Sequence, residues 1–213
     1  KKSCGLDSID ATVLKSAADV IIVPLTYVIN CSIVAGEFPK CWKIAKLIPI
    51  PKKGDTTNVA NYRPISCLSV PSKVLETVIQ EQIVHYFEDR SLLAKNQHGF
   101  RRRRSTLSAI IAMHTDWIRR AEEGKKIGIS FYDQSAAFDL LDATILVEKL
   151  AIYGFDDNSR RWVSSYLTER RQSVLIGSEL SAPRDVEIGA PQGSVLSPVL
   201  YIIQTADIDL WVE

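Results

Sequence analysis

The hydrophobic residues of the chain are spaced in two ways, one typical of helices and one typical of strands. Apolar residues recur every three or four positions, which predicts helices, over residues 7–35, 72–87, 105–123, 140–153, 157–167 and 197–203. Strict alternation predicts strands at 42–50, 126–133, 172–176 and 184–188, the last two as a hairpin. The strand at 126–133 is apolar enough for the middle of a sheet. These elements together predict an α+β fold.

Cap and turn residues indicate where the elements begin and end. Asp7 or Ser8 is suited to cap the first helix, and Gly36 is suited to end it. Pro24 is expected to split or kink this helix because proline has no backbone N–H to donate. Residues 51–64, which read PKKGDTTNVANYRP, are rich in turn formers and predict a polar loop.

Composition and charge indicate an ordinary globular protein. The chain has 213 residues, of which 46% are hydrophobic and 24% charged, with a net charge of +1, so no global cationic field calls for nucleic acid. Its four cysteines form no CxxC pair, which favours reduced thiols in an intracellular protein. The most apolar window, 17–29, is shorter than the roughly 20 residues of a membrane span, so no membrane partner is expected. Because the chain runs from Lys1 to Glu213 without a starting methionine or a closing turn, we expect a piece of a longer polypeptide.

Two aspartates flank the short stretch FYDQSAAFD, at residues 131–139. Asp133 comes at the end of a predicted strand, where a rigid backbone suits a metal-binding carboxylate, and Mg²⁺ prefers such hard oxygen ligands. Aspartate is equally suited to cap a helix, so Asp133 and Asp139 have a purely structural interpretation as well. The residues alone leave both interpretations open.

Several motifs, in order along the chain, resemble those of a known family. FYDQSAAFD, followed by a helix and Tyr-Gly, resembles the first catalytic motif of reverse transcriptases, most closely those of non-LTR (LINE-type) retrotransposons. Further stretches are similar to motifs of the same family: SCGLDSI, WKIAKLIPIPKKGD, NYRPISCLSVPSKVLETVI, NQHGFRRRRST and GAPQGSVLSPVLY. The resemblance implies the fingers and partial palm of a right-hand polymerase, with an incomplete antiparallel palm sheet, over residues 42–213. Residues 1–41 would be a helical segment upstream of this core.

The resemblance also implies an activity, RNA-directed DNA synthesis. Such an enzyme adds nucleotides to a primer 3′-OH on an RNA template, with two Mg²⁺ ions stabilising the attacking and leaving oxygens. Asp133 would be the catalytic metal ligand together with the backbone carbonyl of Gln134. Phe138 would exclude a ribose 2′-OH, and Asp139 would open the next helix. The partners implied are an RNA template, a DNA primer or target, and deoxynucleotides, in the nucleus or cytoplasm.

Basic and loop residues complete the predicted site. Arginine suits phosphate because its planar fork bonds two oxygens at once, and a basic run can track a nucleic-acid backbone. The residues assigned to nucleotide binding are Arg63, Lys73, Arg101, Phe138, Gln192 and Gly193. Those assigned to nucleic acid are Lys52, Lys53, Arg102, Arg103 and Arg104. Without the resemblance, the arginine run would be a solvated basic face and GAPQG an ordinary strand-to-helix connection.

One family motif has no counterpart in this chain. The other metal aspartates of the family lie in an F/Y-A-D-D strand, and no such tetrapeptide occurs here. TADID, at residues 205–209, occupies the turn that precedes that strand in the family, so it is not a substitute. We therefore expect this chain to be inactive alone. The alternatives are a non-catalytic nucleic-acid-binding remnant or domesticated fragment, and a relative of group II intron maturases or telomerase.

Overall fold

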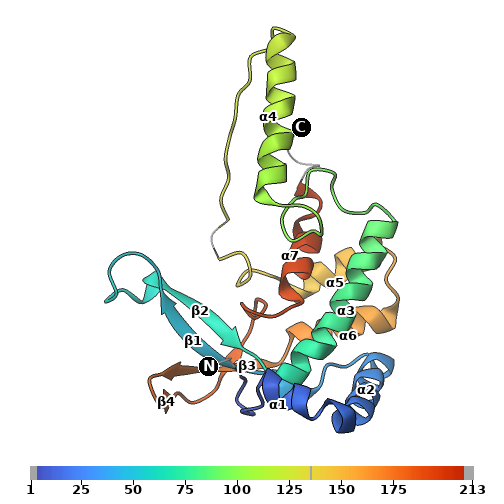
Figure 1. Ribbon diagram of the computed structural model, residues 1–213, viewed down its shortest axis with the longest axis vertical. Coiled ribbons are helices and arrows are strands. Elements are labelled where there is room, and N and C mark those ends of the chain that lie inside the picture. Colours follow the sequence, from blue (N-terminus) through green and yellow to red (C-terminus); the bar gives the residue numbers. More distant parts are fainter. Residues whose placement is uncertain (1–3, 135, 209–213) are drawn as a thin grey trace.

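A computed structural model describes residues 4–134 and 136–208 of the chain. The helices are α1 (Ala11–Ser16), α2 (Ala18–Ala35), η1 (Lys40–Trp42), η2 (Val59–Asn61), α3 (Val70–Asp89), α4 (Thr106–Glu122), α5 (Ala143–Ile152), α6 (Asp157–Leu167) and α7 (Ser197–Thr205). The strands are β1 (Ile44–Pro51), β2 (Tyr62–Cys67), β3 (Arg170–Ile176), β4 (Glu179–Leu180) and β5 (Arg184–Val186). Helices and a partial sheet are mixed along the chain, which confirms a fold of mixed α and β elements (Figure 1).

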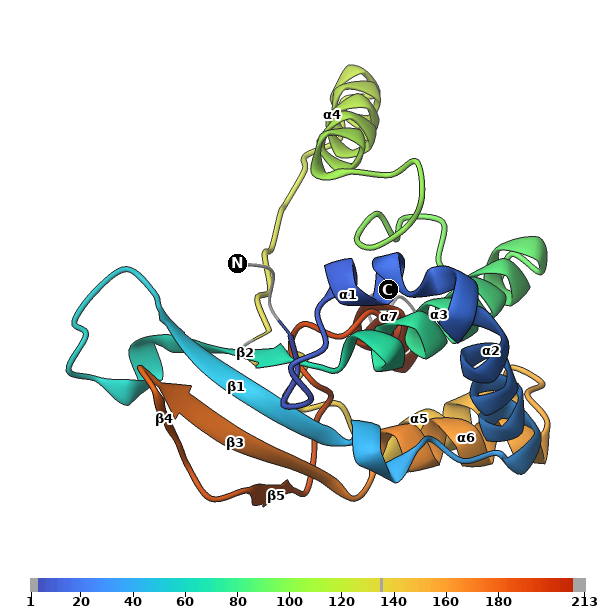
Figure 2. The same cartoon turned by 60° about the horizontal axis from the view of Figure 1, so that its bottom comes forward.

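The sheet is mixed rather than purely antiparallel. Its strand order is β2-β1-β3-β4, with β5 also paired to β3. β1 runs antiparallel to β2, with Leu47 opposite Ser66, and parallel to β3, with Leu47 opposite Val174. The predicted hairpin is confirmed, because β3 and β5 pair antiparallel with Gln172 opposite Arg184. The parallel β1–β3 pair differs from the antiparallel sheet that the family resemblance implied (Figure 2).

The core lies beside the sheet, where α2, α3, α5, α6 and α7 pack together (Figure 2). Phe38, Trp162 and Tyr166 form one aromatic cluster, in which Phe38 meets both other rings edge-on at centroid distances of 5.7 and 5.0 Å. Fully buried leucines and isoleucines of the surrounding helices fill the remaining space: Leu75, Leu146, Leu150, Leu200 and Ile203. Each such side chain stabilises the fold by about 1.5–3 kcal/mol relative to its exposed state.

Helix α4 and the segment after it form an arm that projects from the body (Figure 1). Helix α4 agrees with the helix predicted at 105–123, and Ser105 caps it and forms a capping box with Ser108. The strand predicted at 126–133 is wrong, because these residues have no β partner in the described part of the chain, and Tyr132 is 91% exposed. An alternating apolar pattern becomes a strand only when another backbone supplies the hydrogen bonds of the ladder.

The first helical region is interrupted at a different residue from the one predicted. Asp10, not Asp7 or Ser8, caps α1 by accepting from the backbone N–H of Thr12 at 2.7 Å. The break falls at Ala17, and Pro24 lies inside α2. Neighbouring Val20 and Val23 are exposed, so water can solvate the carbonyl that proline leaves without its helical partner.

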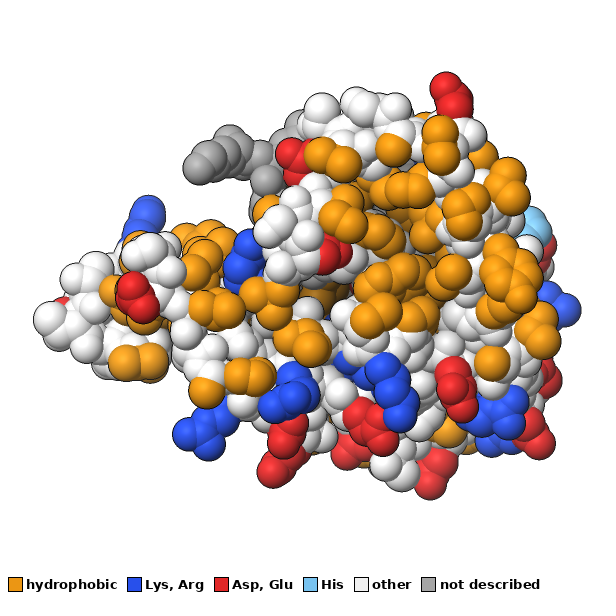
Figure 3. Space-filling view, turned by 90° about the horizontal axis from the view of Figure 1, so that it is seen from below, with side chains coloured by type: hydrophobic (Ala, Val, Ile, Leu, Met, Phe, Trp, Pro, Cys, Tyr) orange, Lys and Arg blue, Asp and Glu red, His pale blue; other side chains and the backbone are white. Residues whose placement is uncertain are grey.

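Helix α2 has an apolar surface that is only partly covered. Ile29 and Ser32 are buried, and the Trp162 indole N–H donates to the Ser32 hydroxyl at 2.9 Å. Much of the other face is exposed, and hydrophobic side chains gather on this side of the molecule (Figure 3). By length and composition alone, α2 could cross a membrane. The apolar window 17–29, from which no membrane span was expected, is shorter than this helix. Apolar helices that pack on soluble cores meet the same criterion.

Strand β2 was predicted to be loop for part of its length. Its first residues belong to NYRP, which reads as a turn because it ends in Pro64. In the structure Pro64 lies opposite Pro49 of β1, and β2 is the terminal strand on its side of the sheet. Proline is tolerated on an edge strand because it interrupts only one side of the ladder.

Candidate functional site

The GAPQG loop, residues 189–193, connects parts of the chain that are distant in sequence. The backbone N–H of Gly189 donates to the carbonyl of Leu141 at 3.0 Å, and that of Ala190 donates to the carbonyl of Phe138 at 2.8 Å. On the other side, the backbone N–H of Ser66 in β2 donates to the Gln192 carbonyl at 2.7 Å. The loop therefore holds β2 and residues 138–141 next to each other.

Two glycines allow these close approaches. Gly193 has φ +116°, and a Cβ built on it would lie 2.9 Å from the Ser66 carbonyl oxygen. Gly189 has φ +99°, and its Cβ would lie 2.8 Å from the Asp139 carbonyl oxygen. L-residues other than glycine rarely adopt such φ values. Glycine at both positions therefore lets the GAPQG loop lie directly against the backbone of Ser66 and Asp139.

A cavity of about 370 Å³ opens beside this loop. Pro64 and Ser66 of β2 line it together with Asp139, Arg170 and Gln192. The helix-opening role expected for Asp139 is wrong. Helix α5 begins at Ala143, and its cap is Asp142, which accepts from the backbone N–H groups of Thr144 and Ile145. The backbone around Asp139 packs on Gly189 instead.

Phe138 lies in a small aromatic cluster at the start of this segment. Its ring meets Phe100 at a centroid distance of 6.3 Å and Tyr201 of α7 at 5.7 Å. The Tyr201 hydroxyl donates a hydrogen bond to the side-chain oxygen of Gln134. Tyr201 thus connects two predicted site residues, Gln134 and Phe138, although no residue-level signal singled it out. Only its position in the motif GAPQGSVLSPVLY pointed toward the site.

Asp133 lies on the exposed segment between α4 and the aromatic cluster. Mg²⁺ needs several oxygen ligands, and a single carboxylate does not supply them. Within residues 4–134 and 136–208, no group of three or more His, Cys, Asp or Glu side chains could hold a metal ion. The described residues therefore do not fit a complete two-metal site.

Asp207 of the TADID stretch has a different partner. Its carboxylate forms an ion pair with the Lys149 ammonium at 2.5 Å, and this hydrogen bond lowers the pKa of Asp207. Lys149 also donates to the Gln204 carbonyl at the end of α7. Asp207 thus connects α5 with the end of α7. Asp209 lies outside the described residues.

Two of the arginines predicted to bind substrates are engaged within the protein. The side chain of Arg101 is 11% exposed, and its guanidinium binds the Glu88 carboxylate of α3 through two hydrogen bonds. The Arg104 guanidinium donates to the Lys95 carbonyl. Arg102 and Arg103 are exposed, as the nucleic-acid role requires.

The other predicted basic residues lie on or near the β1–β2 hairpin. Lys52 and Lys53 follow β1 and are exposed, and the Lys52 ammonium donates to the Ala60 carbonyl at 3.3 Å. Arg63 is exposed on β2, opposite Ile50. Lys73 is partly buried in the first turn of α3. The structure thus places these cations around the hairpin and the start of α3, rather than against Asp133.

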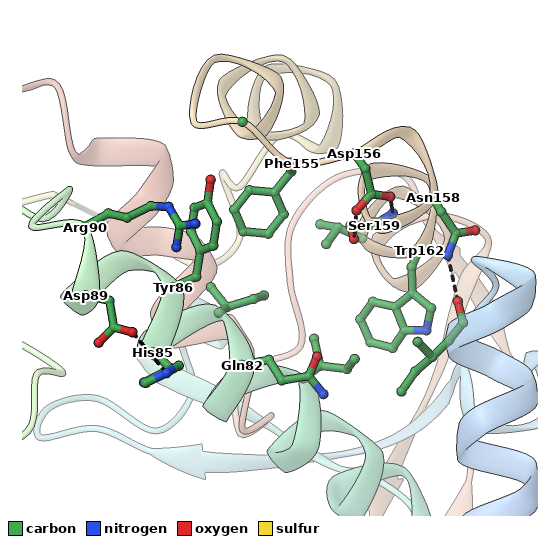
Figure 4. Close-up of a pocket in the computed structure, with 15 residues that line it drawn as sticks. Gln82, His85, Tyr86, Asp89, Arg90, Phe155, Asp156, Asn158, Ser159 and Trp162 are labelled. Atoms are coloured by element: carbon green, nitrogen blue, oxygen red, sulfur yellow. Dashed lines mark hydrogen bonds and ion pairs between the residues drawn. The ribbon is translucent and has the colours of Figure 1, made fainter.

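A second cavity, of about 460 Å³, lies between α2, α3 and α6 (Figure 4). Phe155, Tyr86 and Trp162 are prominent in its lining. Its polar groups are largely satisfied by neighbours, since His85 pairs with Asp89 at 3.0 Å and other rim groups cap helix ends. The predicted site residues do not line this cavity.

Comparison with known proteins identifies the family. Residues 50–213 match the family described as "Reverse transcriptase (RNA-dependent DNA polymerase)". The chain belongs to this reverse transcriptase family, as its motifs indicated. It is 32% identical over 215 residues to the "Probable RNA-directed DNA polymerase from transposon BS" of Drosophila melanogaster, a match that covers 98% of this chain and 23% of that protein.

Two further relatives are also proteins of transposable elements. The "RNA-directed DNA polymerase from mobile element jockey" of Drosophila melanogaster is 31% identical over 98% of this chain and 23% of its own length. The "Retrovirus-related Pol polyprotein from type-1 retrotransposable element R2" of Popillia japonica is 26% identical over 81% of this chain and 24% of its own length. The chain thus spans about a quarter of the length of the curated relatives it matches. They support the retrotransposon class that the motifs predicted.

Proposed function

We propose that this chain is part of an RNA-directed DNA polymerase of a non-LTR retrotransposon. The observation that carries the proposal is the convergence of three family motifs: the GAPQG loop bonds both to Ser66, in NYRPIS, and to Phe138, in FYDQSAAFD. Gln192 and Phe138 would then border the incoming deoxynucleotide, while Lys53, Arg102 and Arg103 would contact the nucleic-acid backbone.

The same proposal assigns parts of the chain to polymerase subdomains, and it names the partners and the cofactor. Residues 42–213 would form the fingers and part of the palm, with 1–41 as the segment upstream. RNA template, DNA primer or target, and deoxynucleotides would be the partners, in the nucleus or cytoplasm. Mg²⁺ is the cofactor proposed for the complete polymerase, and Asp133 with the backbone carbonyl of Gln134 are the ligands proposed in this chain.

We further propose that the 213-residue chain does not polymerise by itself. Its described residues supply no cluster of carboxylates for metal ions, and its sequence has no F/Y-A-D-D tetrapeptide. A primer-extension assay on an RNA template with Mg²⁺ should therefore give no incorporation. Robust incorporation that Asp133→Ala abolishes would contradict this expectation.

Template–primer binding and nucleotide incorporation, measured together, distinguish a polymerase from a non-catalytic remnant. We expect an RNA–DNA template–primer to bind the chain with an affinity that falls as salt rises, because phosphate contacts release counterions. Arg102→Glu with Arg103→Glu should weaken this binding at least tenfold. Lys15→Glu with Lys126→Glu changes the net charge by the same amount at two exposed positions outside the predicted site, and serves as the control for nonspecific charge. In a longer polypeptide of the parent protein, Asp133→Ala should abolish incorporation but leave this binding intact, whereas a remnant would bind without incorporating.

A further inference from the structure

The carboxylate of Glu76 lies at the N-terminus of α7, in the interior of the protein. Glu76 belongs to α3 and is 0% exposed. Its Oε2 accepts from the backbone N–H of Val195 at 2.9 Å and, less closely, from that of Leu196 at 3.4 Å. Its Oε1 accepts from the Ser72 hydroxyl at 2.9 Å. Glu76 therefore connects α3 directly to the residues that follow the GAPQG loop.

Helix α7 lacks a side-chain cap from its own N-cap residue. That residue is Leu196, whose apolar side chain has no acceptor for the first N–H groups of the helix. These donors need a partner when they are buried, and an anion is favoured there because the helix dipole is positive at this end. The Ser194 hydroxyl accepts from the first helical N–H, that of Ser197. Glu76, 120 residues from Leu196 in the sequence, accepts from the two N–H groups just before the helix and places its negative charge at this end.

Buried partners surround the Glu76 carboxylate. The Tyr166 hydroxyl donates to Oε2 at 3.4 Å, and burial raises the pKa of Tyr166, so this hydroxyl stays protonated as a donor. Arg170 is 2% exposed and donates to the Tyr166 carbonyl at 2.8 Å. Its guanidinium supplies a positive charge that interacts electrostatically with Glu76. Hydrogen bonds and a nearby opposite charge are what a buried carboxylate requires.

From α7, short hydrogen bonds continue into the loop. The Ser197 backbone N–H donates to the Ser194 hydroxyl at 2.8 Å, and the Ser197 hydroxyl donates to the Pro191 carbonyl at 3.1 Å. The next residue, Gln192, accepts from the Ser66 backbone N–H at 2.7 Å. A continuous set of bonds thus connects the N-terminus of α7 with the point where the loop contacts β2.

We propose that Glu76 is a positioning residue for the GAPQG loop: it holds the N-terminus of α7, and through it keeps Gln192 against Ser66 of β2. The importance of this position for nucleotide binding rests on the proposed polymerase function. The positioning itself does not, because it concerns contacts within this chain. This role also explains why the Glu76 carboxylate is buried although the core around α3 is mostly apolar.

Glu76→Gln tests the proposal, because glutamine keeps the volume of the side chain and removes its charge. Amide hydrogen exchange would be measured by NMR on the 213-residue chain. Ile83→Ala is the matched control: Ile83 is a buried residue further along α3, and the two variants are compared at equal global stability, set with urea. We expect exchange at Val195, Leu196 and Ser66 to be at least tenfold faster in Glu76→Gln than in the control.

The amide of Ser66 distinguishes positioning from simple capping. Ser66 bonds to Gln192 and not to Glu76, so it reports on the loop. If only Val195 and Leu196 exchange faster, Glu76 caps α7 without positioning the loop, and the proposal is overturned. Equal exchange in both variants overturns it as well.

A second variant covers the case in which Glu76→Gln does not fold. Ser72→Ala removes only the hydrogen bond to Oε1, and we expect a smaller acceleration, about threefold, at the same three amides. No acceleration at Ser66 would overturn the proposal. Amide exchange needs neither template nor metal. A chain that shows the expected exchange pattern but binds no template–primer would therefore contradict the polymerase function and leave the positioning role of Glu76 supported.

Discussion

Arg101 and Glu88 form a two-pronged ion pair, with Nε to Oε1 at 2.9 Å and Nη2 to Oε2 at 2.6 Å. The Arg101 Nη1 donates in addition to the Ala94 carbonyl at 3.0 Å. This pair connects the loop that precedes the arm to α3. The Arg101 guanidinium, predicted to bind the nucleotide, is therefore bound to the Glu88 carboxylate. For Arg101 to bind a nucleotide, a phosphate would have to replace this carboxylate.

The ion pair predicts a specific pH dependence. The hydrogen bond from Arg101 is the main cause that lowers the pKa of Glu88 in the folded protein. A carboxyl with a lowered folded pKa contributes stability above its unfolded pKa and loses it as the pH falls through the folded value. Glu88→Gln should therefore cost about 1 kcal/mol at pH 7 and flatten the acid limb of the curve. Urea unfolding between pH 7 and pH 3 measures this.

Glu81→Gln is the control for the ion pair, because Glu81 is an exposed glutamate on the same helix. It should leave both the stability at pH 7 and the acid limb close to those of the unmodified chain. If Glu88→Gln follows the same pH curve as the unmodified chain, the pair does not stabilise the fold.

Gly193→Ala should be distinctly more destabilising than substitution of another glycine at positive φ. At Gly193 the new Cβ would lie 2.9 Å from a backbone oxygen, which cannot move as a side chain can. Gly124 has φ +73°, and a Cβ there would meet nothing within 4 Å. We expect about 1 kcal/mol of destabilisation for Gly124→Ala and roughly 2–4 kcal/mol for Gly193→Ala. Equal losses in urea unfolding would show that the close contact with Ser66 is not restrictive.

Tyr201→Phe removes one hydroxyl and keeps the ring on Phe138. The lost hydrogen bond to Gln134 should cost about 0.5–1.5 kcal/mol and release the segment that carries Asp133. Chymotrypsin cleavage next to Phe131 or Tyr132 should then become faster, because both are exposed already. Tyr27→Phe, at an exposed position on α2, should leave this cleavage rate unchanged. Identical rates in both variants would show that Tyr201 does not hold the segment.

Leu150→Ala tests the position of the core. Leu150 is fully buried in α5, so the substitution should cost about 2–5 kcal/mol in urea unfolding. Val20→Ala on the exposed face of α2 should change stability by less than about 0.5 kcal/mol. A large loss at Val20 would show that another surface covers α2 in solution.

The helices were predictable because each carries its own signal in the sequence. Helix α4 shows apolar periodicity, a serine at its start and Gly124 at its end, and its bounds agree closely with the prediction. Strands depend on partners instead. The segment 126–133 has the pattern of a strand but pairs with nothing in the described structure, while β2 contains a proline and pairs with β1 nevertheless. Helix starts were uncertain where several aspartates compete, as Asp139 and Asp142 do before α5.

Of the candidate site, only the residues that belong to recognisable motifs could be predicted from the sequence. The motifs singled out Phe138, Gln192 and Gly193, and the structure brings the segments that carry them together, while their role in nucleotide binding stays a prediction. The sequence did not single out Glu76 or Tyr201, because each bonds to a partner far away in the sequence. The engagement of Arg101 by Glu88 was likewise unreadable, since charge alone does not show which groups meet.

The arm divides the protein into two polypeptide stretches that form one folded unit. β1, β2 and α3 precede the exposed segment, whereas α5, α6, β3 and α7 follow it, and the two stretches meet through the β1–β3 ladder and the shared core. A nick between Phe131 and Asp133 would sever the backbone without touching these contacts. The protein is thus built like a pair of complementing fragments, which two separately made peptides could reconstitute.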